Sequence, residues 1–120
     1  MAFETTVVFR DMDVSPALQK DVLAHARKLE RFAQGIISCH VTVDRSEHRH
    51  HHGDRFIVRA RLTLPGAKLE AGQTQSPNHA HEDPHRAVVD TFDALRRQLQ
   101  DYMRKRRGDT KSHTSGSSSE

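Results

Sequence analysis

The spacing of apolar residues changes repeatedly along this 120-residue chain, and these changes restrict the fold more than any other feature. Residues 3–10 alternate apolar and polar, and residues 16–35 repeat at helical spacing. Residues 37–44 and 56–64 alternate again on either side of a polar, His-rich stretch, a short fourth strand is expected near 68–74, and residues 84–106 return to helical spacing. A period of two indicates a strand with one buried face, and a period near 3.6 indicates an amphipathic helix. The sequence therefore predicts the order β-α-β-β-β-α.

Each predicted helix has a clear start. Ser15-Pro16 and Asp83-Pro84 both place a capping side chain before a proline, which suits the first helical position. The first helix should end near Gly35 and the second near Arg106. The two apolar stripes comprise Leu18, Val22, Ala26, Leu29 and Ala33 in the first helix, and Val88, Phe92, Leu95, Leu99 and Tyr102 in the second.

The alternating segments predict a sheet with one buried and one open face. Ile37, Cys39, Val41 and Val43 should face inward, and the Pro65-Gly66 pair should turn the third strand into a short fourth. We expect an α+β, two-layer sandwich with both helices on one face of a four-stranded sheet. A right-handed crossover should make the first two strands parallel, and the other pairs should be antiparallel. The expected core comprises Leu18, Leu29, Cys39, Val41, Val58, Leu62, Val88, Phe92, Leu95 and Leu99.

Composition sets the limits of this domain and excludes several functions. Every Leu, Ile, Val and Phe lies at or before Leu99, so we expect a domain at 1–107 and a disordered, Ser-rich tail at 108–120. The single cysteine and the lack of long apolar runs favour a cytoplasmic protein with no membrane segment. Cys39 should point away from His40, and no nucleotide-binding motif is present, so we expect neither an enzyme nor a cofactor.

Basic residues line the outer side of the first helix. On a helical wheel Lys20, Arg27 and Arg31 fall within about 40° of each other, opposite the apolar stripe, with Lys28 at the edge. The formal net charge of +3 is too mild to identify a nucleic-acid-binding protein by itself. Charge leaves two interpretations open: an ordinary solvated helix face, or a surface that binds phosphates.

The second helix carries mixed charges. Arg86, Arg97 and Arg104 line its outer face, and the basic end includes Lys105. Aspartates are interspersed among them: Asp90, Asp93 and Asp101. Cations at a helix C-terminus also favour the helix dipole, so this basic end has a structural explanation as well as a functional one.

The helix sequences resemble the short ribosome hibernation-promoting factors, or protein Y family, also called sigma-54 modulation proteins. The residues that match comprise Ser15 to Leu18, Arg27 to Phe32, the LPGA stretch from Leu64, and Asp83, Ala87, Val88, Asp90, Leu95, Gln98, Leu99, Arg104 and Lys105. One departure is His85, where the family usually has an aromatic residue. Long members also carry a second, dimerising domain, and only a Ser-rich tail follows here, so we expect no autonomous pairing of ribosomes.

This resemblance implies the predicted fold and a function. Family members bind in the decoding channel of the small ribosomal subunit, where their basic helix residues contact ribosomal RNA. The resemblance thus implies a translation inhibitor that stabilises idle ribosomes during stress, and a monomer when off the ribosome. The residues expected to bind RNA are Lys20, Arg27, Lys28, Arg31, Arg86, Arg97, Arg104 and Lys105.

Histidines form two clusters whose role stays open. The clusters comprise His48, His50, His51 and His52, and then His79, His81 and His85. The predicted topology places both at the same end of the sheet, where they could form a solvated polar surface, an RNA contact, or a zinc or nickel site. Alternative functions are therefore a His-rich metal-binding protein or a double-stranded-RNA-binding module, whose α-β-β-β-α order resembles the last five elements.

Overall fold

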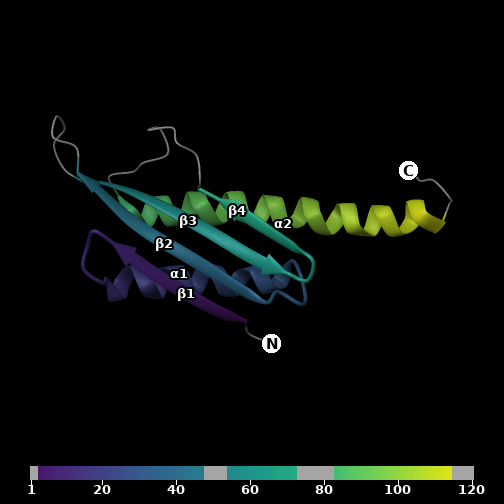
Figure 1. Cartoon of the computed structure of the whole chain (residues 1–120), viewed down its shortest axis with the longest axis horizontal. Coiled ribbons are helices and arrows are strands. Elements are labelled where there is room, and N and C mark those ends of the chain that lie inside the picture. Colours follow the sequence, from purple (N-terminus) through teal and green to yellow (C-terminus); the bar gives the residue numbers. More distant parts are fainter. Residues whose placement is uncertain (1–2, 48–53, 73–82, 115–120) are drawn as a thin grey trace.

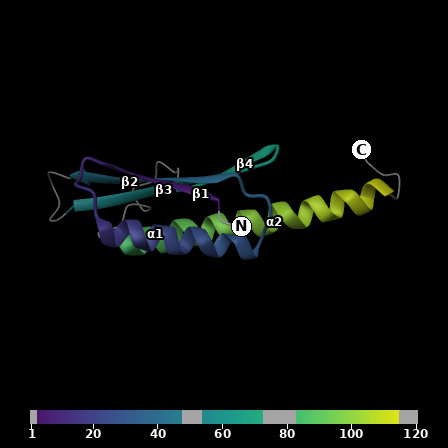
Figure 2. The ribbon, with the colours of Figure 1, turned by 90° about the horizontal axis from the view of Figure 1, so that it is seen from below.

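The computed structural model describes residues 3–47, 54–72 and 83–114 (Figure 1). Its elements are β1 (Glu4–Arg10), α1 (Pro16–Lys28), the 3-10 turn η1 (Leu29–Arg31), β2 (Ser38–Glu47), β3 (Asp54–Leu64), β4 (Ala67–Ala71) and α2 (Pro84–Thr114). The order β-α-β-β-β-α is the predicted one. Both helices lie against one face of the sheet, and the other face is open (Figure 2).

The four strands lie in the sequence order β1-β2-β3-β4. β1 pairs with β2 in parallel, with Val7 opposite Val41. The other two pairs are antiparallel, with Val41 opposite Ala60 and Leu62 opposite Leu69. The predicted strand order and directions are thus confirmed.

The core fills the space between the sheet and the two helices. All ten residues of the expected core are buried, and Val22, Val41, Leu62, Val88, Leu95 and Leu99 have no exposed surface. Cys39 is 1% exposed, and burial raises the pKa of its thiol to about 12. This confirms both the register of β2 and the prediction that Cys39 is a core residue.

Specific hydrogen bonds fix α2 on the sheet. The buried Thr91 hydroxyl donates to the Val58 carbonyl oxygen at 3.0 Å, and the Gln98 amide donates to the Glu70 carbonyl oxygen at 2.7 Å. Gly72, which follows β4, has a φ of +80°, and a Cβ atom there would collide with the Val58 carbonyl oxygen. The two hydrogen bonds from Thr91 and Gln98 fix the position and rotation of α2 on the sheet, and therefore decide which of its side chains face outward.

Three sequence-based expectations were wrong. The first helix was expected to end near Gly35, but α1 ends at Lys28 and the chain tightens into the 3-10 turn η1, which ends at Arg31. Ile37 was expected to face the core but is 54% exposed, because it precedes the first residue of β2; Ile36 packs against the core instead. The second helix was expected to end near Arg106, but α2 continues to Thr114, past the edge of the sheet (Figure 1). Once a helix has formed, each further residue adds a backbone hydrogen bond, so the helix can extend beyond its contact with the sheet. The division into a domain at 1–107 and a tail at 108–120 remains a prediction. In the parts of the chain that the structure describes, no helix has the length and apolar character needed to cross a membrane.

Candidate nucleic-acid interface

The helix α1 is built so that one line of cations faces the solvent. The Ser15 hydroxyl accepts a hydrogen bond from the Leu18 backbone N–H at 3.2 Å, and Pro16 is the first helical residue, so the predicted cap is confirmed. Leu18, Val22 and Ala26 are buried against the sheet. The opposite side of the helix is therefore exposed, and it carries Lys20, Arg27, Arg31 and, at its margin, Lys28.

We call Lys20, Arg27 and Arg31 the α1 stripe. Within the described ranges, neither these side chains nor Lys28 form an ion pair. Asp21, the nearest acid in sequence to Lys20, instead contacts His25 at 3.4 Å and His85 at 3.0 Å. At about 1.5 Å per residue the stripe spans roughly 16 Å, enough for more than one phosphate group. Its cations can bind an anion without first releasing a carboxylate.

The basic residues of α2 are in a different state, because aspartates one turn away neutralise them. We call Arg86, Arg97, Arg104 and Lys105 the α2 stripe. Its ion pairs are Arg86–Asp90 at 3.6 Å, Arg97–Asp93 at 3.7 Å, Arg104–Asp101 at 2.6 Å and Lys105–Asp101 at 3.2 Å. Pairs at these helical spacings are stabilising but modest.

Two of these aspartates show the strength of the pairing. A hydrogen bond from Arg96, at 2.6 Å, is the main cause that lowers the pKa of Asp93 below its ordinary value of 3.8. Hydrogen bonds from Arg104 and then Lys105 lower the pKa of Asp101 in the same way. Both carboxylates are therefore ionised at neutral pH and compete with any external anion.

The two helices meet along a shallow groove. The rings of His25 and Phe92 stack with centroids 5.7 Å apart. Lys28 lines a hollow of about 160 Å³ between the helices together with Asp93 and Arg96. The structure thus brings Lys28 beside α2, while Arg86 and Arg104 lie roughly 27 Å apart along the helix. The predicted RNA-binding residues form a broad surface on the helix layer rather than one compact site.

Sequence analysis missed a basic hollow on the open face of the sheet. Arg10, His40, Arg59 and Arg61 line this hollow of about 270 Å³ together with Thr42 and Ala60. Two of its cations are paired, Arg59 with Asp44 at 3.2 Å and Arg61 with Glu70 at 2.8 Å. The alternation of the strands already placed these residues on the open face, but only the pairing of β1, β2 and β3 brings them together. Arg96, the main partner of Asp93, was also not among the predicted site residues.

The histidine clusters cannot be placed as a group. All their members except His85 lie outside the described residues, so the predicted proximity of the two clusters stays a prediction. His85 is the second residue of α2, where its backbone N–H donates to the Asp83 carboxylate at 3.0 Å and its ring contacts Asp21 on α1. Among the described residues, no group of three or more His, Cys, Asp or Glu side chains is arranged to hold a metal ion.

Comparisons with known proteins agree with this geometry. Two similar solved structures share the fold. One is a ribosomal subunit interface protein from Coxiella burnetii, with a TM-score of 0.63 at 22% identity over 84% of this chain and 98% of the other. The second is the N-terminal domain of Protein Y from Thermus thermophilus, with a TM-score of 0.59 at 18% identity over 85% of this chain and 99% of the other.

At the level of sequence, no curated protein gives a significant match. A model of one protein family, described as sigma 54 modulation protein / S30EA ribosomal protein, matches residues 5–107. This match covers α1, β2, β3 and β4, all but the first residue of β1, α2 up to Arg107, and every residue of the two basic stripes. The chain therefore belongs to the sigma 54 modulation protein / S30EA ribosomal protein family.

Proposed function

We propose that this protein binds the small ribosomal subunit in the decoding channel and holds ribosomes idle by occupying the space of messenger and transfer RNA. The observation that carries this proposal is the α1 stripe, whose exposed cations form no ion pair with the residues that the structure describes. Membership of a family that includes a ribosomal protein supports the ribosome as partner. Two structures with the same fold also come from proteins named for a ribosomal subunit interface or as Protein Y.

The physical basis of this binding is phosphate neutralisation. Ribosomal RNA presents phosphates on all sides of a channel, and each phosphate bound by Lys or Arg releases condensed counterions. Such contacts position a protein without reading base sequence, as an occupant of a fixed channel requires. In this proposal the α1 stripe supplies most of the affinity, and the α2 stripe extends the same surface along the helix layer.

A matched pair of variants tests the proposal. Lys20→Gln, Arg27→Gln and Arg31→Gln together remove the α1 stripe; Arg10→Gln, Arg59→Gln and Arg61→Gln remove equal charge from the open sheet face. Each variant is sedimented with purified small subunits and added to a cell-free translation reaction. The α1 variant should lose binding and inhibition, and the sheet variant should keep most of both. Equal behaviour of the two variants would show that the helix layer is not the binding face.

The same purified protein can be used to distinguish ribosome binding from two other functions. A double-stranded-RNA-binding module would bind free duplex RNA as tightly as small subunits. A competition experiment with duplex RNA therefore distinguishes it from a ribosome-binding protein. A His-rich metal-binding protein would retain zinc or nickel after purification without an affinity tag. Metal analysis of that material tests this alternative independently of ribosomes.

A further inference from the structure

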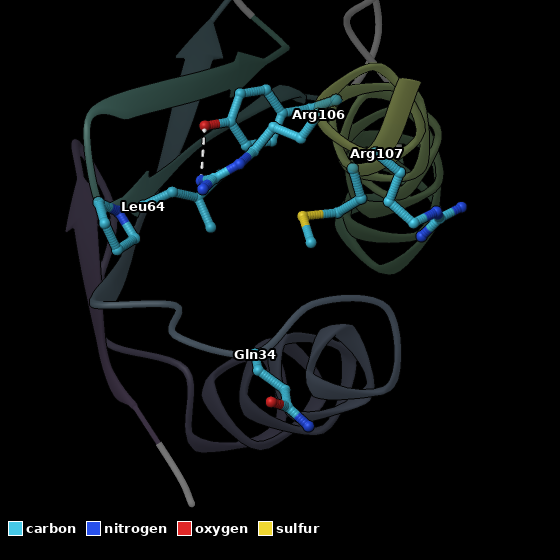
Figure 3. A pocket seen from close by; sticks show the side chains of 7 residues that line it. Gln34, Leu64, Arg106 and Arg107 are labelled. Carbon is cyan, nitrogen blue, oxygen red and sulfur yellow. Dashed lines mark hydrogen bonds between the residues drawn. The ribbon is translucent and has the colours of Figure 1, made fainter. Parts of the chain in front are cut away.

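A hollow lies where α2 passes the edge of the sheet, and no residue of the two basic stripes is among its lining residues. Its volume is about 360 Å³, at the lower end of the range of roughly 300–1,000 Å³ that small-ligand pockets occupy. Its walls come from α2, from the turn between β3 and β4, and from the segment that follows η1 (Figure 3). The lining residues are Gln34, Leu64, Pro65, Tyr102, Met103, Arg106 and Arg107.

One part of the hollow suits a flat, apolar ring. Tyr102 and Met103 are half-buried and pack against the edge of the core, with Leu64 and Pro65 on the facing turn. An aromatic ring and a polarisable thioether both favour stacking with another π-system. The space between the helix and the turn is therefore walled by groups that can hold a planar ligand.

The other part of the hollow is cationic. Arg106 and Arg107 line it, and none of the lining residues in the described part of the chain is acidic. The Arg106 guanidinium lies 6.0 Å from the centre of the Tyr102 ring and donates to the Tyr102 hydroxyl at 3.5 Å. In Figure 3 Arg106 reaches across toward Leu64, while Arg107 points away from the other labelled side chains. A ligand stacked on the ring would thus meet a positive charge beside it.

The exposed Gln34 completes the set from the α1 side of the hollow. Its amide can both donate and accept hydrogen bonds, as the edge of a nucleobase does. Stacking surface, edge partner and phosphate-binding guanidinium groups are the parts used to hold single-stranded RNA bases. A peptide could use the apolar walls, but an anionic ligand also matches the Arg106 guanidinium beside the Tyr102 ring.

We propose that this hollow takes one unpaired nucleotide of RNA, with its base on Tyr102, its edge at Gln34 and its phosphate at Arg106. The inference rests on the proposed function in that ribosomal RNA would supply the nucleotide. It adds a contact that recognises a base, whereas the α1 stripe recognises only charge. It also assigns a role to Arg106, a residue of the basic end of α2 that lies outside the α2 stripe.

The intrinsic fluorescence of Tyr102 can be used to detect this contact. It has one tyrosine and no tryptophan, so intrinsic fluorescence excited in the aromatic band comes from Tyr102 alone. The full-length protein is titrated with a single-stranded RNA hexamer and with a hexamer of the same backbone in which every base is absent. Saturable quenching by the first at a concentration where the second has little effect supports the proposal. Equal responses to both would overturn it, because the backbone charge alone would then explain binding.

Variants carry the test to the ribosome. Tyr102→Leu keeps an apolar side chain but removes the ring, and Arg106→Gln removes the adjacent charge. If a base stacks there, Tyr102→Leu should weaken binding to small subunits roughly fivefold or more, with little change in the dependence on salt. Unfolding midpoints close to the parent's establish that both variants fold. Unchanged affinity of a folded Tyr102→Leu variant contradicts the inference.

Crosslinking identifies the occupant. Gln34→Cys with a short photo-crosslinker attached is bound to small subunits and irradiated. An RNA-linked product supports the proposal; a protein-linked product, or none, overturns it in favour of a peptide or an empty hollow. Failure here is distinguishable from failure of the proposed function, since a protein that sediments with small subunits through the α1 stripe can still leave this hollow unfilled.

Discussion

The outer faces of α1 and α2 carry similar cations in different electrostatic states. On α1, Lys20, Arg27 and Arg31 have no ion-pair partner among the described residues. On α2, Arg97 and Arg104 each contact an aspartate one turn away, at 3.7 and 2.6 Å. The helices lie side by side in one layer, so burial by the sheet is not the cause of this difference (Figure 2). Its cause is the placement of Asp93 and Asp101 in the sequence.

The difference in ion pairing between α1 and α2 affects how strongly each helix would bind RNA in the proposed function. An exposed ion pair contributes only about 0–1 kcal/mol, so a phosphate can displace an aspartate from its arginine. The free energy gained from the phosphate contact is then reduced by the energy of the ion pair that is broken. Cations without a partner give up only hydration. We therefore expect α1 to determine affinity and α2 to contribute less per charge, although both resemble basic RNA-binding surfaces in sequence.

The largest effect should follow from the core that holds both faces together. Leu95 has no exposed surface and sits on the buried side of α2, so Leu95→Ala should lower the free energy of unfolding by roughly 2–5 kcal/mol. Arg97→Gln on the exposed side of the same helix should change it by less than about 0.5 kcal/mol. Chemical denaturation of both variants measures this contrast. Similar values for the two would mean that α2 is not anchored as described, and the comparison of outer faces would lose its basis.

The next largest effect should be on binding. Lys20→Gln, Arg27→Gln and Arg31→Gln together should reduce the slope of log affinity against log salt by about 2, given roughly 0.7 per lost phosphate contact. The triple variant Arg86→Gln, Arg97→Gln and Arg104→Gln removes equal charge and should reduce the slope by less. Affinity for small subunits measured across a series of salt concentrations gives both slopes. A larger change from the α2 variant would reverse the assignment of the two helices.

The fold was predictable because its signals are local and repeated. Changes of period, Ser15-Pro16 and Asp83-Pro84 set the elements, and alternation set which faces are buried. Ile37 was misplaced because the alternation of apolar and polar residues in the sequence begins at Ile37, one residue before β2 begins at Ser38. Gln98, part of the family resemblance, proves to have a structural role, since its amide bonds the Glu70 carbonyl and docks α2.

The candidate site was predictable only in part. A helical wheel places cations on an outer face, and that placement was correct for α1 and α2. Which cations are neutralised depends on rotamers and on contacts between elements, as when Asp21 contacts His85 on the other helix. The hollow at Tyr102 needs three segments far apart in sequence, so neither period nor motif could reveal it.

A smaller effect should come from freeing cations on α2. Asp101→Asn removes the carboxylate shared by Arg104 and Lys105, which should strengthen binding to small subunits by a few fold, about what one exposed pair is worth. Asp13→Asn removes the same charge from an exposed position before α1 and is the matched control for net charge. Equal gains from both would mean that only net charge matters. No gain specific to Asp101 would show that the α2 stripe does not face RNA.

The smallest effect should appear in the titration of the α2 aspartates. The pKa values of Asp93 and Asp101 both lie below the ordinary value of 3.8. The main cause is Arg96 at Asp93, whereas Arg104 and Lys105 together lower the pKa of Asp101. Because folding depresses these pKa values, their contribution to stability is present above pH 3.8 and is lost as pH falls through each lowered pKa.

Carboxyl carbon NMR shifts followed from pH 6 to pH 2 measure the titration of both aspartates. Arg96→Gln should raise the pKa of Asp93 because it removes the largest cause of the lowering, while Arg104→Gln should raise that of Asp101 less, since Lys105 still donates. Arg86→Gln should move neither. If the ordinary value were found for both carboxyls in the parent protein, the α2 cations would be as available as those of α1, and the contrast between the helices would have to be abandoned.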